Sequence, residues 1–217
     1  MDDLPLVQSL VEKLASNLSV PVSCKIRIFP ELEDTIAYAR MLEKAGCSLL
    51  AVHGRTRDQK DGKVVRADWS IIKAVKEALS IPVLANGNIR YLDDVYECIK
   101  ETGADGVMSA EALLENPALF AGYQVAPQPM TIPLEEEGDF SLDQTKLLLE
   151  YLDFLDKYPV PMRMVRAHVH RMLGNWFRRH PDIREELNKE FKLSKEFLED
   201  IIQKLLSRQE RIPLLPP

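Results

Sequence analysis

The sequence predicts an α/β fold: a partial TIM (β/α) barrel followed by a small all-helical domain. From about residue 22 to 108, short apolar runs rich in β-branched residues alternate with longer segments of helical period, which is typical of parallel βα units. Polar residues gather at the carboxyl ends of these runs. Because a (β/α) barrel carries its active site at the carboxyl ends of its strands, we expect a site there.

Composition and charge restrict the class of protein. The chain has 217 residues, 46% of them hydrophobic, which is enough for one core and a smaller second one. A formal charge of −6 excludes a surface that binds nucleic acid throughout, but allows a local basic patch. Three cysteines without CxxC spacing indicate neither a disulfide framework nor a zinc site, so we expect no metal and a reducing compartment.

Targeting signals are not evident in the sequence. No apolar run reaches the roughly 18 residues that span a bilayer. The N-terminus is acidic, with Asp2 and Asp3, where a signal or transit peptide would be basic. We therefore expect an intracellular protein, cytoplasmic or nuclear, that has no membrane partner.

The elements of the barrel region follow one another regularly. An amphipathic helix, LVQSLVEKL, opens the chain, with the two acids near the positive end of its dipole. Nearly continuous apolar runs predict buried strands at 22–28, 48–54, 81–87 and 104–110. Helices are expected near 34–45, 69–79 and 92–102, the first capped by Asp34 and ended by Gly46. A Rossmann sheet would need a GxGxxG turn after its first strand, which this sequence lacks.

Four βα units make only half of an eight-stranded barrel. Such a sheet would leave two strand edges and one apolar face uncovered. Three explanations stay open at this point. The chain is a truncated product of a longer protein, it pairs with the missing N-terminal half-barrel or a self-partner, or the missing half is lost from the gene as read.

A linker separates the two expected domains. Residues 123–140 contain three prolines, an acidic triplet and a glycine. The expected domains are therefore 1–122, the half-barrel, and 141–217, a helical domain. Its helices are predicted near 141–157, 161–179, 182–191 and 194–208, with Ser141 and Ser194 as N-caps.

Polar side chains mark the ends of the first two strands. Lys25 and Arg27 lie two residues apart, hence on one face, where basic groups need a bound acceptor or carboxylates elsewhere in the barrel. His53 can contact a ligand or donate a proton near neutral pH, although a lone histidine is often structural. Arg55 can contact phosphate or stack on a base.

The last two strands end in candidate anion sites. Asn86, Gly87 and Asn88 form a turn whose backbone N–H groups can approach a phosphate, although Asn-Gly is also an ordinary turn. Ser109 ends the next strand, and a short helix is expected to begin after it. Two neighbouring backbone anion sites after the last two strands match the usual phosphate site of a barrel.

A basic stretch lies in the helical domain. Residues 160–181 contain five arginines and three histidines but no Asp or Glu. Arg163, Arg166 and His170 are spaced i, i+3 and i+7 on one helical face, where they can meet a phosphate backbone; a solvated basic face is the alternative. Trp176 and Phe177 can stack on a base, but we expect them in the core.

The motifs KIR, VHGRT, PVLANGNI and GVMSAEALLENPALF, in this order, resemble the FMN-binding barrel of tRNA-dihydrouridine synthases, most closely the eukaryotic type that acts on uridines 16 and 17. The segment PVPMRMVRAHVHRM is similar to that family's tRNA-binding helical domain. The resemblance implies the last four βα units of the barrel. It also implies an enzyme whose FMN, reduced by NADPH, passes hydride to a flipped-out uridine in the D-loop of tRNA.

The resemblance also assigns site residues. It implies that FMN is bound by Lys25, His53, Asn86, Gly87, Asn88, Ser109 and Ala110, and that tRNA is contacted by Arg55, Arg163, Arg166 and His170. Many family members have Gly-Arg where Ser109 and Ala110 stand, so backbone contact to the phosphate is expected there.

No catalytic residue is assigned. In the family the first half-barrel brings a flavin-binding strand and a loop with a catalytic cysteine, and no segment here matches either. Cys24, Cys47 and Cys98 are expected to be small buried residues. Turnover by this chain alone should be poor, and a non-catalytic tRNA-binding fragment is the alternative. A metabolic barrel enzyme that binds a sugar phosphate would not need the Arg-rich helical domain.

Overall fold

The computed structural model describes residues 3–59, 65–125, 132–133, 142–208, 210–212 and 214–215. The chain divides into two compact units, Met1–Ser109 (unit 1) and Ala110–Pro217 (unit 2). This division lies upstream of the linker expected at 123–140, most of which is outside the described residues.

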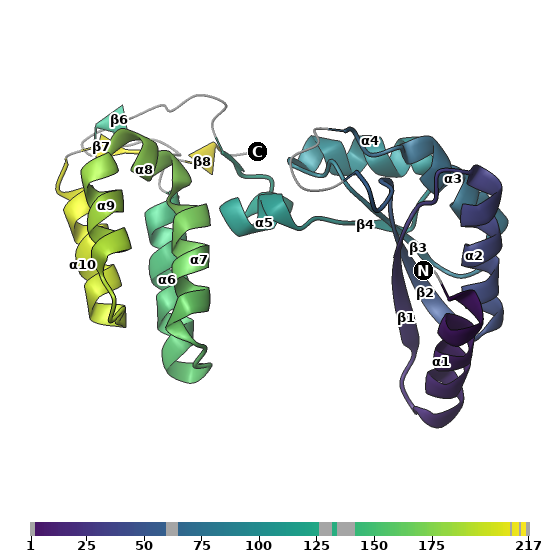
Figure 1. Cartoon of the computed structure of the whole chain (residues 1–217). Helices are drawn as coiled ribbons and strands as arrows, with labels where there is room; N and C mark the ends of the chain where they lie inside the picture. Colours follow the sequence, from purple (N-terminus) through teal and green to yellow (C-terminus); the bar gives the residue numbers. More distant parts are fainter. Residues whose placement is uncertain are drawn as a thin grey trace. The chain divides into compact units, whose positions relative to one another are not determined.

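Unit 1 alternates helices and strands along the chain (Figure 1). Its elements are α1 (Leu4–Asn17), β1 (Val22–Arg27), α2 (Leu32–Lys44), β2 (Cys47–His53), α3 (Trp69–Ala78), β3 (Val83–Asn86), α4 (Leu92–Thr102) and β4 (Gly106–Met108). The strands form one parallel sheet in the order β1-β2-β3-β4. The predicted α/β class, with four parallel strands, is confirmed.

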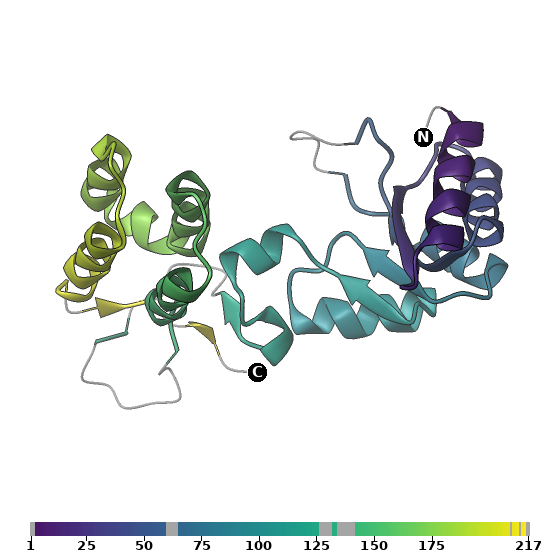
Figure 2. The ribbon, with the colours of Figure 1, turned by 90° about the horizontal axis from the view of Figure 1, so that it is seen from below.

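The core of unit 1 lies on one face of this sheet. Connections between adjacent parallel strands are almost always right-handed, so successive helices fall on the same face. Helix α3 packs between α2 and α4 along it (Figures 1 and 2). Ile26, Val52 and Ala85, from three neighbouring strands, are buried there with Trp69 and Ile72 of α3. The opposite face carries both apolar side chains, such as Ala51 and Leu84, and polar ones near the carboxyl ends of the strands.

Two features of α2 test the predicted helix ends. The helix begins at Leu32 after Glu31, so the prediction that Asp34 is the N-cap is wrong. Asp34 lies in the first turn, where a carboxylate still favours the positive end of the helix dipole. Gly46 follows the end of the helix with a φ of +101°, and a Cβ there would lie 2.6 Å from Cβ of Ala15. Only glycine fits that position without strain.

Unit 2 is built mainly from helices. They are α5 (Glu111–Glu115), α6 (Gln144–Lys157), α7 (Met162–Met172), α8 (Gly174–Arg179), α9 (Pro181–Lys189) and α10 (Lys195–Leu206). A 3₁₀ turn spans Leu119–Ala121, and two short strand pairs join β5 (Gln124–Val125) to β8 (Leu214–Leu215) and β6 (Ile132–Pro133) to β7 (Glu210–Arg211).

Local sequence explains several helix ends of unit 2. The Ser194 hydroxyl accepts a hydrogen bond from the Phe197 N–H at 3.2 Å, which confirms its predicted role as N-cap of α10. Ser141, the other predicted cap, lies outside the described residues; Asp143 caps α6. The helix expected over 161–179 is broken at Leu173, before the weak helix formers Gly174 and Asn175.

The core of unit 2 is separate from that of unit 1. Trp176 and Phe177 are buried in it, as predicted, together with Leu148, Val169 and Ile201. In the part of the chain that the structure describes, no helix is both long enough and apolar enough to cross a membrane.

Candidate functional site

The strand registers of unit 1 bring three predicted residues into one row. Arg27 of β1 is paired with His53 of β2, and His53 with Asn86 of β3. Residues in register on parallel strands point to the same face. We call Arg27, His53 and Asn86 the strand-end row; it lies at the carboxyl ends of the strands, on the face opposite the helices. Lys25 lies two residues before Arg27, on the same face.

Among the residues that the structure describes, the basic groups of this face have no acidic partners. Within the described residues, no carboxylate forms an ion pair with Lys25, Arg27 or Arg55. Partial burial of the Lys25 ammonium, and then the charge of Arg27, lower the pKa of Lys25. Arg27 donates one hydrogen bond, from Nη1 to the Thr56 carbonyl at 2.9 Å. The face is therefore a concentration of uncompensated positive charge, which favours an anionic ligand.

Arg55 ties the end of β2 to the turn after β3. Its guanidinium donates to Asn88 Oδ1 at 2.5 Å and to the carbonyl of Val65 at 2.5 Å. A third nitrogen lies 3.1 Å from Nε2 of His53. All three of these interactions are within unit 1, and they orient side chains of the candidate flavin site. The expected contact of Arg55 with tRNA stays a prediction.

His53 is a neutral hydrogen-bond donor in this arrangement. Burial, then the charges of Arg27, Lys25 and Arg55, lower the pKa of His53 to about 4. A guanidinium has only donors, so Nε2 of His53 must accept from Arg55 and the proton stays on Nδ1. The imidazole can donate to a ligand through Nδ1, but it is not charged near neutral pH.

The turn after β3 requires its glycine. Gly87 has a φ of +109°, and a Cβ there would lie 2.7 Å from Cβ of Ala67 and 3.0 Å from Cδ2 of His53. Asn88 follows with a φ of 63°, and the Trp69 indole donates to the Gly87 carbonyl at 3.1 Å. Among the described residues, no backbone hydrogen bond uses the N–H of Gly87 or Asn88. Both donors stay available to a phosphate.

Two other predicted phosphate residues use their side chains within the protein. Asn86 donates from Nδ2 to the Met108 carbonyl at 2.7 Å, and Ser109 Oγ donates to the Ile89 carbonyl at 2.8 Å. Because the Ser109 hydroxyl donates within the protein, a contact from Ser109 to a phosphate would use its backbone N–H. Ala110 is exposed and is the first residue of unit 2.

The three residues of unit 2 that were predicted to contact tRNA have different surroundings in the structure. Arg163 is exposed on α7. Arg166 instead donates from both terminal nitrogens to the carbonyls of Leu187 and Glu190 at the end of α9. His170 lines a hollow, and burial, then the charges of Arg184 and Arg166, lower its pKa.

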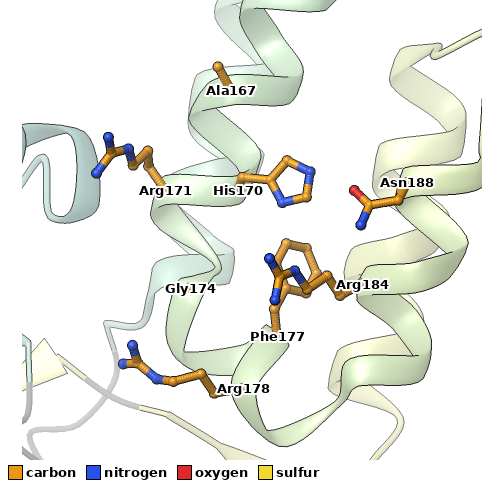
Figure 3. A pocket seen from close by; sticks show the side chains of 8 residues that line it. All are labelled: Ala167, His170, Arg171, Gly174, Phe177, Arg178, Arg184 and Asn188. Atoms are coloured by element: carbon orange, nitrogen blue, oxygen red, sulfur yellow. The ribbon is translucent and has the colours of Figure 1, made fainter. Parts of the chain in front are cut away.

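This hollow also contains residues that the sequence reasoning missed. It is lined by His170, Arg171, Gly174, Phe177, Arg178 and Arg184, and we call it the basic hollow (Figure 3). Arg171 and Arg178 belong to the Arg-rich stretch, which could have marked them. Arg184 follows that stretch, in the mixed-charge segment PDIREELNK. It reaches the basic hollow only because α9 packs against α8.

The fold and the strand-end row define an α/β protein with basic and polar side chains gathered at the carboxyl ends of a parallel sheet. The profile of the family described as "Dihydrouridine synthase (Dus)" matches residues 1–210. The chain belongs to this family.

Individual relatives indicate the type within the family. The chain is 47% identical over 188 residues to "tRNA-dihydrouridine(16/17) synthase [NAD(P)(+)]-like" of Rattus norvegicus, which covers 87% of this chain and 39% of that protein. It is 36% identical to the 16/17 synthase of Schizosaccharomyces pombe, covering 84% and 45%. A human "tRNA-dihydrouridine(20a/20b) synthase [NAD(P)+]-like" is 42% identical, covering only 56% and 38%. The similarity is thus to the 16/17 type.

The chain spans about two fifths of the length of the curated relatives it matches. Among solved structures, phosphonopyruvate hydrolase in complex with oxalate and Mg²⁺ matches with a TM-score of 0.46 and 18% identity, covering 55% of this chain and 46% of that one.

Proposed function

We propose that this chain supplies the last four βα units of the FMN-binding (β/α) barrel of a tRNA-dihydrouridine synthase, and that FMN lies on the strand-end row. The observation that carries the proposal is the uncompensated positive charge of Lys25, Arg27 and Arg55 at the carboxyl ends of the strands. FMN has a phosphate and a ring edge rich in acceptor atoms, and these residues offer donors to both.

The residues have distinct roles in this proposal. Lys25 and the Nδ1–H of His53 donate to the flavin ring from neighbouring strands. The backbone N–H groups of Gly87 and Asn88 bind the phosphate, together with those of Ser109 and Ala110. Bound FMN, reduced by NADPH, supplies the hydride that converts uridine to dihydrouridine.

The described cysteines do not supply an activated thiol. Burial raises the pKa of Cys24 to about 12 and that of Cys98 to about 11. Cys47 and Cys98 are buried, and Cys24 is half-buried. A protonated thiol of this kind packs as a small apolar residue. The proton donor to the uracil ring, and the other half of the barrel, must then come from sequence that the longer relatives have or from a second polypeptide.

Flavin binding tests this function directly. The purified chain is incubated with FMN and desalted, and the flavin absorbance retained per chain is recorded, with and without the N-terminal half-barrel of a relative. We expect retention, and Lys25→Met should weaken it about tenfold because one charge-assisted hydrogen bond is lost.

Lys13→Met is the matched control, since it removes the same charge from the exposed surface of α1. Equal flavin retention by the two variants would contradict the proposed site. So would a chain that retains no flavin even when the half-barrel is supplied.

A non-catalytic tRNA-binding role is the second candidate, favoured by the basic hollow of unit 2. It predicts salt-dependent tRNA binding without flavin retention. The two functions are therefore separated by measuring both properties on one preparation.

A further inference from the structure

Unit 1 has two outermost helices, α1 at the β1 edge of the sheet and α4 towards the β4 edge (Figures 1 and 2). Helix α1 packs on α2 and β1, and α4 packs on α3, β3 and β4. Among the described residues, β1 and β4 each pair with a strand on one side only. Such edges are normally paired or covered.

The exposed apolar side chains of unit 1 gather on these two helices. On α4, Tyr96 is 62% and Ile99 is 38% exposed. Among the described residues, the inner helices α2 and α3 expose one large apolar side chain, Leu32 at the start of α2. The exposed leucines of α1 are Leu4, Leu6, Leu10 and Leu14.

The leucines of α1 face away from α2. At 3.6 residues per turn, Leu10 and Leu14 lie on one side of the buried Val11, and Ala15 lies on its other side. Ala15 is the residue that approaches Gly46, which follows α2. The leucine side of α1 is therefore the outer side of unit 1.

The apolar side of α4 is the mirror case. Tyr96 and Ile99 lie on the opposite side of the buried Val95 from the side that the leucines take relative to the buried position of α1. Since α1 and α4 are at opposite ends of one row of helices, both apolar sides point outward. Patches of this kind usually mark contact surfaces.

The face of the sheet opposite the helices also carries apolar residues. Leu84 is in register with Ala51, and Met108 with Asn86, so all four point to that face. Strands of parallel sheets are normally buried on both faces. Unit 1 covers only one face, and a second layer is needed for the other.

The order of elements shows what fits both ends at once. Each strand of unit 1 is preceded by its helix, from α1 and β1 to α4 and β4. A second copy placed with its β1 beside β4 puts its α1 beside α4, as α2 stands beside α1 within one copy. Two copies supply eight strands and eight helices, the number that closes a (β/α) barrel.

We propose that two copies of this chain pair through unit 1 into a closed eight-stranded barrel. The β1 edge of each copy would join the β4 edge of the other, and the leucines of α1 would pack on Tyr96 and Ile99 of the second copy. Two-fold symmetry makes the two junctions identical. The inference rests on the half-barrel of the proposed function, and the second copy would complete the wall of the flavin site.

Closure also brings cations together. Lys25, Arg27 and Arg55 of both copies would surround one interior, where like charges repel. An anion that binds the dimer better than the single chain tightens pairing. We therefore expect tighter pairing in potassium phosphate than in potassium chloride of equal ionic strength, and the reverse order would contradict the closed arrangement.

Sedimentation velocity of the full 217-residue chain over a concentration series tests the inference. We expect reversible formation of a species with twice the chain mass of 24.7 kDa, and nothing larger, because two half-barrels leave no open edge. Leu10→Lys and Tyr96→Glu should each weaken the dimer at least about a hundredfold, since each buries an unpaired charge at both junctions. Both side chains are exposed in the single chain, so circular dichroism should show unchanged folding.

A mixture of these two variants gives the sharpest readout. Leu10 and Tyr96 each lie about two turns before the ends of their helices, hence at similar heights. The mixed dimer has one unchanged junction and one in which the introduced lysine meets the introduced glutamate. We expect it to be at least about tenfold tighter than the dimer of either variant alone.

Leu32→Lys is the matched control, because it changes an exposed leucine on an inner helix. It should dimerise like the unchanged chain. A chain that stays monomeric would overturn the inference, and one that then binds the N-terminal half-barrel of a relative would identify that half as the occupant. A mixture no tighter than its components would also overturn it.

Flavin retention is recorded on the same samples. A dimer that responds to Leu10→Lys and Tyr96→Glu but retains no flavin would support this inference and contradict the proposed flavin site. A monomer that retains flavin would do the reverse.

Discussion

His53 has a protonation state that depends on its place in the sheet. A solvated histidine titrates near pH 6.5. Burial and the neighbouring charges of Arg27 and Lys25 lower the pKa of His53 to about 4. The same cations that attract an anion therefore keep this imidazole neutral, which makes it a hydrogen-bond donor to a flavin rather than an acid.

The lowered pKa predicts how the stability of unit 1 changes with pH. Above pH 6.5 His53 is neutral in both the folded and the unfolded chain. As the pH falls towards 4, only the unfolded chain takes up the proton, so the free energy of unfolding decreases. We expect a loss on the order of 1 kcal/mol at pH 5, after discounting for solvent screening.

The measurement is urea unfolding at pH 7.5 and pH 5, followed by tryptophan fluorescence, for the unchanged chain and His53→Gln. Trp176 of unit 2 contributes equally to both, so the difference reports on Trp69 of unit 1. The variant should lose less stability on acidification. An identical loss in the two proteins would show that His53 is not held neutral.

Arg166 was predicted to contact tRNA, but its guanidinium hydrogen-bonds the last carbonyls of α9, a common way to satisfy a helix C-terminus. Arg166→Ala should therefore lower the free energy of unfolding of unit 2 by about 1.5–3 kcal/mol, the range for hydrogen bonds to a charged group. Arg163→Ala, at an exposed position of the same helix, should change it by less than about 0.5 kcal/mol. Thermal unfolding of both variants checks this, and similar effects would refute the structural role of Arg166.

At the scale of elements, the turn after β3 combines a left-handed backbone with a close approach. Gly87→Ala would strain a φ of +109° and place a methyl group 2.7 Å from Ala67. We expect a loss of at least about 2 kcal/mol in the stability of unit 1, together with weaker flavin retention.

Gly103→Ala is the matched control for this turn. Gly103 ends α4 with a φ of +68°, but a Cβ there would have no heavy atom within 4 Å. The Gly103→Ala substitution should lower the free energy of unfolding by about 1 kcal/mol, which is the cost of a left-handed conformation for alanine. It should leave flavin retention unchanged. Equal effects in urea unfolding would mean that the close approach at Gly87 is unimportant.

The break between α7 and α8 helps to form the basic hollow. The apolar period of residues 161–179 predicts one helix, because it continues across Leu173. The structure ends α7 at Met172 and starts α8 at Gly174, which places this glycine at the open centre of the basic hollow.

At the scale of the whole molecule, each unit has its own core, and the sheet of unit 1 is bounded by β1 and β4. Helix α1 and its C-cap residue expose leucines spaced four residues apart, Leu6, Leu10, Leu14 and Leu18, which are 52%, 51%, 47% and 49% exposed. Exposed apolar stripes of this kind usually mark contact surfaces. In the proposed barrel, the half that this chain does not contain would cover this stripe and the edge of β1.

The elements of unit 1 could be predicted from the sequence alone. Buried parallel strands are continuous apolar runs, and helices repeat their apolar residues every three to four positions. The positive φ of Gly87 and the burial of Trp176 follow from similarly local rules. Order along the chain also sufficed for the family resemblance, since the motifs are short and occur in a fixed sequence.

Tertiary structure alone decided which side chains meet. The register of β1, β2 and β3 aligned Arg27, His53 and Asn86 in one row, and a shift of one residue would have turned each to the other face. Packing of α9 against α8 brought Arg184 to the basic hollow, and the end of α9 occupied Arg166. Local propensity acts over a few residues, whereas the partners of a charged side chain depend on groups that are brought near only when the chain is packed.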